Sequence, residues 1–185
     1  QRPVRHGFSR AAVYAHPANR RLLALSAHGV SSPRRSASSL YFSSAGGVDA
    51  LCIARWDGSQ WYSVGVGLSD MVWCLYVDTI ENVLYAGGAF NYSADNSDTL
   101  LVNHIAKWNG VKWDTVGCGT SSDVYDLCMY RGDLFAGGFF NHVGTQPIHH
   151  LARWNGLQWD SLDCGPDWGV HALAVYKDEL YVGGN

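Results

Sequence analysis

The chain is poor in charged residues and has no long hydrophobic run. Charged side chains make up 16% of its 185 residues, against about 25% in an average soluble domain. Apolar stretches stay well short of the ~20 consecutive residues that a membrane-spanning helix needs. We therefore expect no insertion into a membrane.

Cysteine is present in an odd number and without the spacing of a metal site. The separations between the five cysteines, 22, 44, 10 and 36 residues, match no zinc or redox motif, and an odd number argues against a complete disulfide framework. Two of them occupy matching repeat positions, which leaves open a bridge between neighbouring repeats beside the alternative that both are small buried side chains. No cofactor is expected. The cysteines are Cys52, Cys74, Cys118, Cys128 and Cys164, and the matching pair is Cys118 and Cys164.

Acidic residues are missing from the start of the chain. Residues 1–39 carry seven arginines and no Asp or Glu, a net charge of +7, whereas residues 40–185 carry six basic and sixteen acidic residues, a net charge of −10. The basic segment shows neither the two-residue period of a strand nor that of a helix, so it is predicted to be a disordered leader. The acidic remainder would be repelled by a nucleic-acid backbone, and nucleic acid is not an expected partner.

What the chain does contain is a phrase with two tryptophans, written three times. It reads Ile-Ala-Arg-Trp-Asp-Gly-x-x-Trp at 53–61, Ile-Ala-Lys-Trp-Asn-Gly-x-x-Trp at 105–113 and Leu-Ala-Arg-Trp-Asn-Gly-x-x-Trp at 151–159. A second phrase, which ends in a double glycine, follows each copy. The first tryptophan recurs after 52 and then 46 residues, a period that indicates a repeat architecture. The positions expected to be structural are Trp56, Trp61, Gly87, Gly88, Trp108, Trp113, Gly137, Gly138, Trp154, Trp159, Gly183 and Gly184.

Each tryptophan phrase predicts a β-hairpin. Asp-Gly and Asn-Gly favour a two-residue type I′ turn. Counting outward from the turn at 109–110 pairs Trp108 with Val111 and Ala106 with Trp113, which places these four side chains on one face. We interpret the hairpin tryptophans as core residues. A tryptophan left exposed would instead indicate a platform on which a sugar ring stacks.

Two further strands follow each hairpin, which predicts four antiparallel strands per repeat. An apolar strand comes first, then a turn, then the strand that ends in the double glycine. Four strands in 46–52 residues is the size of one β-propeller blade. The predicted fold is therefore all-β, a partial β-propeller of about three four-stranded antiparallel blades that forms an arc of a larger ring and is truncated at the C-terminus. The apolar strands are predicted at 72–77, 124–130 and 170–176, and the repeats at about 40–90, 91–140 and 141–185.

The combined pattern resembles a known family. Leu-Tyr-x-Gly-Gly-x-Phe, a loop, the tryptophan phrase and then Val-Gly-x-Gly are similar to kelch-like β-propeller repeats of the galactose-oxidase central-domain type. The resemblance covers residues 40–185 and is nearest to repeats of bacterial secreted and cell-surface proteins and of the fungal cortical polarity-marker family. It implies a propeller and an extracellular or cell-surface location. It does not select a function, because such propellers serve as enzymes, adhesins and scaffolds.

The loops after the double glycines vary in length and hold the candidate ligand-binding residues. The first of them is rich in oxygen donors suited to Ca²⁺ but lacks the spacing of an EF-hand loop. The second contains three histidines without a further ligand at metal spacing. A solvated loop is the alternative for both, and no metal site is predicted. The candidates are Asn91, Asp95, Asp98, His142, His149 and His150.

No catalytic set is found in the sequence. Asp126 lies within a predicted strand and has no partner acid or nucleophile, so it forms no general acid–base pair. We expect a non-catalytic propeller segment of a secreted or cell-surface protein that binds a protein or a glycan. A fragment of a propeller enzyme, a hydrolase or oxidase whose active site is completed by further blades, and a structural spacer are the alternatives. The remaining blades of the same chain are the expected neighbours, and a homo-oligomer is the alternative.

Overall fold

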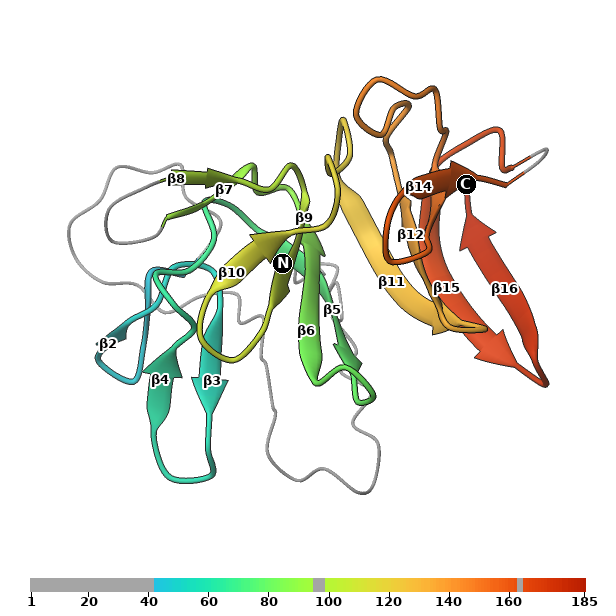
Figure 1. Cartoon of the computed structure of the whole chain (residues 1–185). Helices are drawn as coiled ribbons and strands as arrows, with labels where there is room; N and C mark the ends of the chain where they lie inside the picture. The colour runs from blue at the N-terminus through green and yellow to red at the C-terminus, as the bar shows by residue number, and fades with distance from the viewer. Residues whose placement is uncertain (1–41, 95–98, 163–164) are drawn as a thin grey trace, which may run out of the picture.

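The structure, a computed structural model, describes residues 42–94, 99–162 and 165–185, and these residues are all-β. They form sixteen strands in antiparallel sheets of two to four strands (Figure 1). Within these ranges no helix has the length and apolar character to cross a membrane. The predicted leader, residues 1–39, lies outside the described residues.

Two of the sheets have four strands each. The strand order is β10-β9-β6-β5 in the first and β11-β12-β13-β14 in the second, and all neighbours are antiparallel. Each sheet is therefore a meander. The strands of the first sheet are β5 (Val72–Asp78), β6 (Val83–Gly88), β9 (Ile105–Trp108) and β10 (Trp113–Thr115). Those of the second are β11 (Val124–Tyr130), β12 (Asp133–Gly138), β13 (Leu151–Trp154) and β14 (Trp159–Ser161).

The other described sheets have two strands each. Hairpin β3–β4 carries the tryptophan phrase, as β9–β10 and β13–β14 do, and so corresponds to the second half of a four-stranded sheet. Hairpin β15–β16 ends in the double glycine and corresponds to the first half. The bounds are β1 (Ser44–Ala45), β2 (Val48–Asp49), β3 (Ala54–Trp56), β4 (Trp61–Ser63), β7 (Tyr92–Ala94), β8 (Thr99–Leu101), β15 (Val170–Tyr176) and β16 (Glu179–Gly184).

The four-stranded sheets do not begin and end at the boundaries of the repeats predicted from the sequence. Strand β6, which ends in the double glycine, pairs with β9 of the tryptophan phrase that follows it, and β12 pairs with β13 in the same way. The predicted repeat boundaries near residues 90 and 140 therefore lie in the connection between the second and third strands of a sheet. The described residues form two complete four-stranded sheets, the two half-sheets β3–β4 and β15–β16, and the two further hairpins β1–β2 and β7–β8.

The first strands of successive units pack against one another, with β11 between β5 and β15. The first glycine of each double glycine makes this approach possible. A Cβ atom on Gly87 would lie 2.6 Å from Cγ1 of Val124, and one on Gly137 would lie 2.5 Å from Cγ1 of Val170. Both valines are almost fully buried. Because each of these glycines has no side chain, a valine of the next unit packs directly against its backbone.

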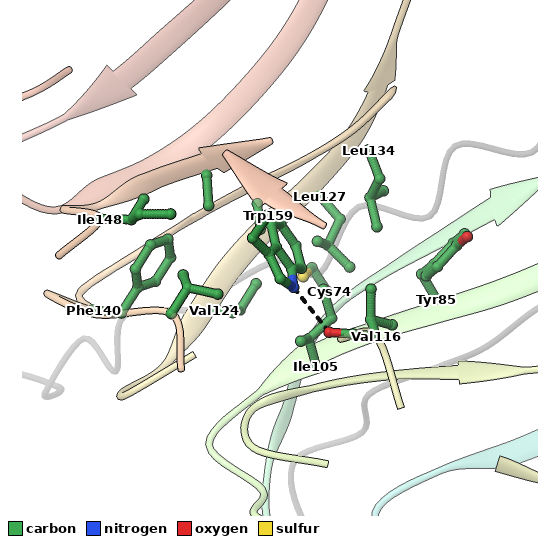
Figure 2. Packing of buried hydrophobic residues seen from close by; sticks show 13 residues of the cluster. Cys74, Tyr85, Ile105, Val116, Val124, Leu127, Leu134, Phe140, Ile148 and Trp159 are labelled. Carbon is green, nitrogen blue, oxygen red and sulfur yellow. Dashed lines mark hydrogen bonds between the residues drawn. The ribbon is translucent and has the colours of Figure 1, made fainter. Parts of the chain in front are cut away.

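In each four-stranded sheet, the second tryptophan of the tryptophan hairpin forms a hydrogen bond to the connection that precedes the sheet. The indole nitrogen of Trp159 donates a hydrogen bond to the backbone oxygen of Val116 at 2.9 Å, within the cluster that Figure 2 shows. Trp113 donates to the backbone oxygen of Val64 at 3.0 Å. Trp113 and Trp159 are buried, whereas the first tryptophan of each hairpin and Trp61 are only half-buried. The prediction that all six tryptophans are core residues therefore holds fully for these two.

The predicted pairing inside the tryptophan hairpins is wrong by two residues. Trp108 pairs with Trp113 rather than with Val111, so the loop has four residues. The cause is the side chain of Asn109, whose Oδ1 accepts the backbone N–H groups of Val111 and Lys112, each at 2.9 Å. This side-chain cap replaces the type I′ turn. Because a shift of two residues preserves the alternation of a strand, Trp108 and Trp113 remain on one face, while Val111 is exposed.

Candidate functional site

The two ends of the sheets differ in how regular their connections are. At one end lie the short turns within hairpins. At the other end lie the described parts of the connections after the double glycines, 89–94, 99–104 and 139–150, and of those between units, 64–71, 116–123, 162 and 165–169. We call this second end the variable rim; in Figure 1 it is the upper edge, where β7 and β8 lie. Loops held on a regular scaffold are where binding residues concentrate.

A serine in each of the first two connections between units holds the variable loop beside it in place. Oγ of Ser69 accepts the backbone N–H groups of Asn91 and Tyr92 at 3.1 and 3.0 Å. Oγ of Ser121 accepts those of Asn141 and His142 at 3.2 and 3.1 Å. The backbone of each loop therefore leaves its sheet in the same way.

The candidate residues of the first loop are not all placed. Asn91 is exposed on the variable rim, and its backbone oxygen accepts the N–H groups of Val102 and Asn103. Asp95 and Asp98 lie outside the described residues. The predicted set of oxygen donors is therefore represented in the structure by Asn91 alone.

The candidate histidines of the second loop have different surroundings. His149 and His150 are neighbours, with ring centroids 6.1 Å apart, and Nδ1 of His149 lies 3.3 Å from Oδ1 of Asn141. His150 is buried and has a positive φ of 61°. His142 is exposed and forms no described contact with the other two rings. In the described residues no group of three or more His, Cys, Asp or Glu side chains is arranged to hold a metal ion.

Two exposed aromatic rings stand beside His150. Phe139 packs against His150 with ring centroids 5.6 Å apart and meets Trp168 edge-to-face at 6.0 Å. Trp168 is 54% exposed and Phe139 is 42% exposed. An exposed tryptophan thus occurs on the variable rim, although not in one of the hairpins.

A groove lies next to these rings. It has a volume of about 470 Å³ and runs between residues 147 and 149–151 on one side and residues 161–162 and 165–167 on the other. His149 and His150 line it, together with the polar side chains of Ser161 and Asp167. Aromatic faces beside side chains that form hydrogen bonds are suited to a ligand with both apolar and polar surfaces.

Sequence reasoning missed Phe139 and Trp168. Their repeat counterparts are small or polar: Ala89 stands at the position of Phe139, and Asp70 and Ser122 stand at that of Trp168. This departure from the repeat is the signal that could have found them. Their proximity was not accessible, because it depends on how two sheets pack.

The carboxylate of Asp126 serves as an anchor. Its Oδ1 accepts the N–H of Leu127 at 2.9 Å, and its Oδ2 accepts the N–H of Leu173 in the next unit at 2.7 Å. Burial raises the pKa of this carboxyl, against the effect of the two hydrogen bonds. Because each oxygen accepts a backbone N–H, one of them from the next unit, Asp126 joins β11 to β15.

Three cysteines are buried thiols without a described disulfide. Burial raises the pKa of Cys52 and of Cys128 to about 12, and it also raises the pKa of Cys74. A thiol protonated at neutral pH is a poor nucleophile. Cys118 is exposed, and Cys164, its predicted counterpart in a bridge, lies outside the described residues.

Comparison with known proteins finds no family, no curated protein and no solved structure that matches the chain. The kelch-like resemblance thus remains a prediction from the motifs. A function for this chain has to come from the geometry of its own residues.

Proposed function

We propose that the chain is an arc of a β-propeller that acts as a non-catalytic scaffold of a secreted or cell-surface protein and binds a glycan at the variable rim. The propeller architecture is supported by consecutive four-stranded meanders whose first strands lie side by side. It is also supported by the repeated step from unit to unit, in which Val124 sits on Gly87 and Val170 sits on Gly137. The same contact at each step is what a radial array of blades requires.

The exposed pair Trp168 and Phe139 carries the glycan part of the proposal. An exposed tryptophan offers a flat apolar surface to the C–H face of a sugar ring. The indole of Trp168 is held by its edge-to-face contact with Phe139. The groove beside the pair supplies His149, Ser161 and Asp167 as partners for sugar hydroxyl groups. The hydrogen bonds of Asp126 to two backbone N–H groups, one of them in the next unit, support a structural role for this carboxylate.

A glycan array followed by titration calorimetry tests this function. We expect the chain to bind one class of glycan, and we expect Trp168→Ala and Phe139→Ala each to weaken binding about tenfold or more, which corresponds to a loss of roughly 1.4 kcal/mol. Leu157→Ala is the matched control, because Leu157 is an exposed apolar residue in a hairpin turn at the opposite end.

Two outcomes would contradict the proposal. One is an array with no binding by a folded chain. The other is glycan binding that Trp168→Ala leaves unchanged, which would move the site away from the groove. Capture of a protein that is lost in the same two variants would replace the glycan by a protein ligand.

A further inference from the structure

One tripeptide on the variable rim has the form that N-glycosylation requires. Asn91-Tyr92-Ser93 is the only Asn-x-Ser or Asn-x-Thr tripeptide in the 185 residues. In such a tripeptide the asparagine amide accepts the glycan, and the hydroxyl group two residues later is needed for the transfer. Because so short a motif also arises by chance, the surroundings of its two end residues decide whether it fits the modification.

The first of these residues, Asn91, has a fixed backbone and an exposed side chain. Its N–H donates to Oγ of Ser69 at 3.1 Å, and its backbone oxygen accepts the N–H of Val102 at 2.8 Å. The side chain is exposed at the start of the connection that contains β7 and β8, at the upper edge of Figure 1. A glycan is bulky and polar and needs a surface position, and the folded chain offers one at Asn91.

The second four-stranded sheet contains a counterpart of this segment. Residues 90–93 correspond to residues 140–143, and the phenylalanine that begins each segment is fully buried. Ser93 forms an isolated β-bridge with Leu68 of the connection between units. Val143 forms the same bridge with Thr120. The two loops therefore have the same local contacts, and they differ at the residue that completes the tripeptide.

Packing alone does not explain the hydroxyl group of Ser93. Ser93 is 2% exposed and Val143 is 4% exposed, so both positions are buried. Oγ of Ser93 donates to the backbone oxygen of Gly67 at 3.3 Å, which is longer than the distance of about 2.7–2.8 Å that is usual for an O–H···O bond. A buried hydroxyl group costs free energy unless a good hydrogen bond compensates for it, and a valine has no such cost. The group that packing does not require is the one that N-glycosylation requires.

The burial of Ser93 also sets the order of events. A transferase cannot reach its hydroxyl group in the folded chain, because this residue is 2% exposed. In the unfolded chain both ends of the tripeptide are accessible. Transfer therefore has to precede folding of the loop, after which Ser93 is buried and Asn91 remains on the surface.

We propose that Asn91 carries an N-linked glycan, added while the chain enters a secretory pathway and before β7 and β8 form. The donor is an oligosaccharide linked to a lipid through a diphosphate. Nδ2 of Asn91 forms a bond to the anomeric carbon of the first sugar, and the bond from that carbon to the diphosphate oxygen breaks. The lipid diphosphate leaves with the electron pair, and one amide proton passes to a base.

The glycan would lie on the same rim as the groove but on a different unit. Asn91 belongs to the connection between β6 and β9, whereas the groove borders the connection between β12 and β13. We therefore expect Asn91→Gln to leave ligand binding at the groove unchanged. The proposal rests on the secreted or cell-surface location proposed above, and it does not rest on glycan binding at the groove.

The experiment is mass spectrometry of the full chain, secreted from eukaryotic cells behind a signal peptide. Intact mass is measured before and after treatment with a peptide N-glycosidase in heavy-oxygen water. We expect one glycan per chain. We also expect its removal to leave a labelled carboxylate at position 91 and at no other asparagine.

Three variants test the two ends of the tripeptide. Asn91→Gln removes the acceptor, and Ser93→Val removes the hydroxyl group while reproducing the counterpart residue. We expect no glycan on either variant. Ser93→Thr is the matched control, because it keeps the hydroxyl group, and we expect it to be glycosylated.

A fourth variant tests the argument from the two loops. Val143→Ser completes an Asn-His-Ser tripeptide at 141–143, and the side chain of Asn141 is exposed as that of Asn91 is. We expect a second glycan on this variant. Its absence would contradict the argument that the shared geometry of the loops accommodates a glycan.

A secreted, folded chain whose mass the glycosidase leaves unchanged overturns the proposal, as does a glycan that persists in Asn91→Gln. Thermal unfolding separates lost glycosylation from lost folding. We expect Ser93→Val to be at least as stable as the parent chain after its glycan is removed, and lower stability would contradict the argument from packing. A glycan on Asn91 together with a blank glycan array refutes only the binding function, whereas a bare Asn91 on a chain that binds a glycan refutes only this proposal.

Discussion

At the scale of single residues, equivalent positions in the repeats have different surroundings. Gly87, Gly137 and Gly183 are each the first residue of a double glycine, yet only Gly87 and Gly137 have a valine of the next unit against them among the described residues. The position two residues after the valine of each bulge differs in the same way. Asp126 joins two units through the N–H of Leu173, whereas the other units have Cys74 and Ala172 there, which lack a carboxylate. What a repeated residue contributes to stability is therefore set by whether a next unit is present.

We predict that Gly137→Ala destabilises the chain and that Gly183→Ala does not. The Cβ atom at 137 would be 2.5 Å from Val170, whereas at 183 the nearest distance is 3.8 Å. Forcing a methyl group into a packed contact costs about 1–3 kcal/mol in the free energy of unfolding. Urea unfolding followed by circular dichroism, at concentrations where the chain is monomeric, compares the two variants. Equal stability of Gly137→Ala and the parent chain would refute the close packing of β12 on β15.

At the scale of elements, each hairpin is closed by a turn that its own residues dictate. In the tryptophan hairpins, Asp57, Asn109 and Asn155 each accept two backbone N–H groups of the turn through a side-chain oxygen. Two-residue turns with positive φ at both positions occur instead between β11 and β12, at 131–132, and between β15 and β16, at 177–178. Turns of the type I′ kind are thus present in the fold, but in hairpins β11–β12 and β15–β16, whereas β5–β6 has a four-residue loop.

We predict that Trp159→Phe costs more stability than Trp154→Phe. Phenylalanine cannot donate to the backbone oxygen of Val116, which would be left without its partner in a buried position. An unsatisfied buried acceptor costs about 1–3 kcal/mol in the free energy of unfolding. Trp154 is half-buried, packs on Trp159 and donates no described hydrogen bond, so it is the matched control. Chemical unfolding of both variants measures the difference, and the reverse order of stability would contradict the role of the indole hydrogen bond.

At the scale of the whole molecule, the units are arranged in sequence order, and the two four-stranded sheets have described neighbours on both sides. Strand β11 packs between β5 and β15, and the largest buried cluster includes residues of both four-stranded sheets. Hairpin β15–β16 has a described neighbour on one side only. Stability should therefore fall from the second sheet toward the ends of the described chain.

We predict that backbone amides of β12 exchange with solvent at least tenfold more slowly than the equivalent amides of β16 in the monomer. Both strands have the same sequence pattern, so the difference isolates the effect of a paired edge and a covered face. Hydrogen exchange read by mass spectrometry on dilute protein measures the difference. Similar protection in both strands of the monomer would show that β16 has a partner which the described residues do not include.

The sequence predicted much of the secondary structure and little of the candidate site. The strands at 72–77, 124–130 and 170–176 correspond to β5, β11 and β15, because apolar residues bounded by turn residues are a local signal. The hairpin register was predicted wrongly, because the choice between a type I′ turn and a side-chain cap depends on a single hydrogen-bonding group. The candidate histidines were found, but the neighbouring aromatic pair Phe139 and Trp168 was not, since these two residues are distant in sequence and belong to no motif.

The sequence by itself determined that the described residues are all-β, that their strands are antiparallel and that the strand pattern repeats, because these properties follow from the two-residue period and from turn residues close together in the chain. Tertiary structure alone decided which strands share a sheet. It decided that β6 and β12 pair with strands of the tryptophan phrase that follows them, and which glycines have a valine of the next unit packed against them. It also decided that Trp113 and Trp159 are buried while Trp168 is exposed. The physical reason is that burial and close packing depend on surfaces brought together from different repeats, and a period that is the same in every repeat does not say which of them has a neighbour.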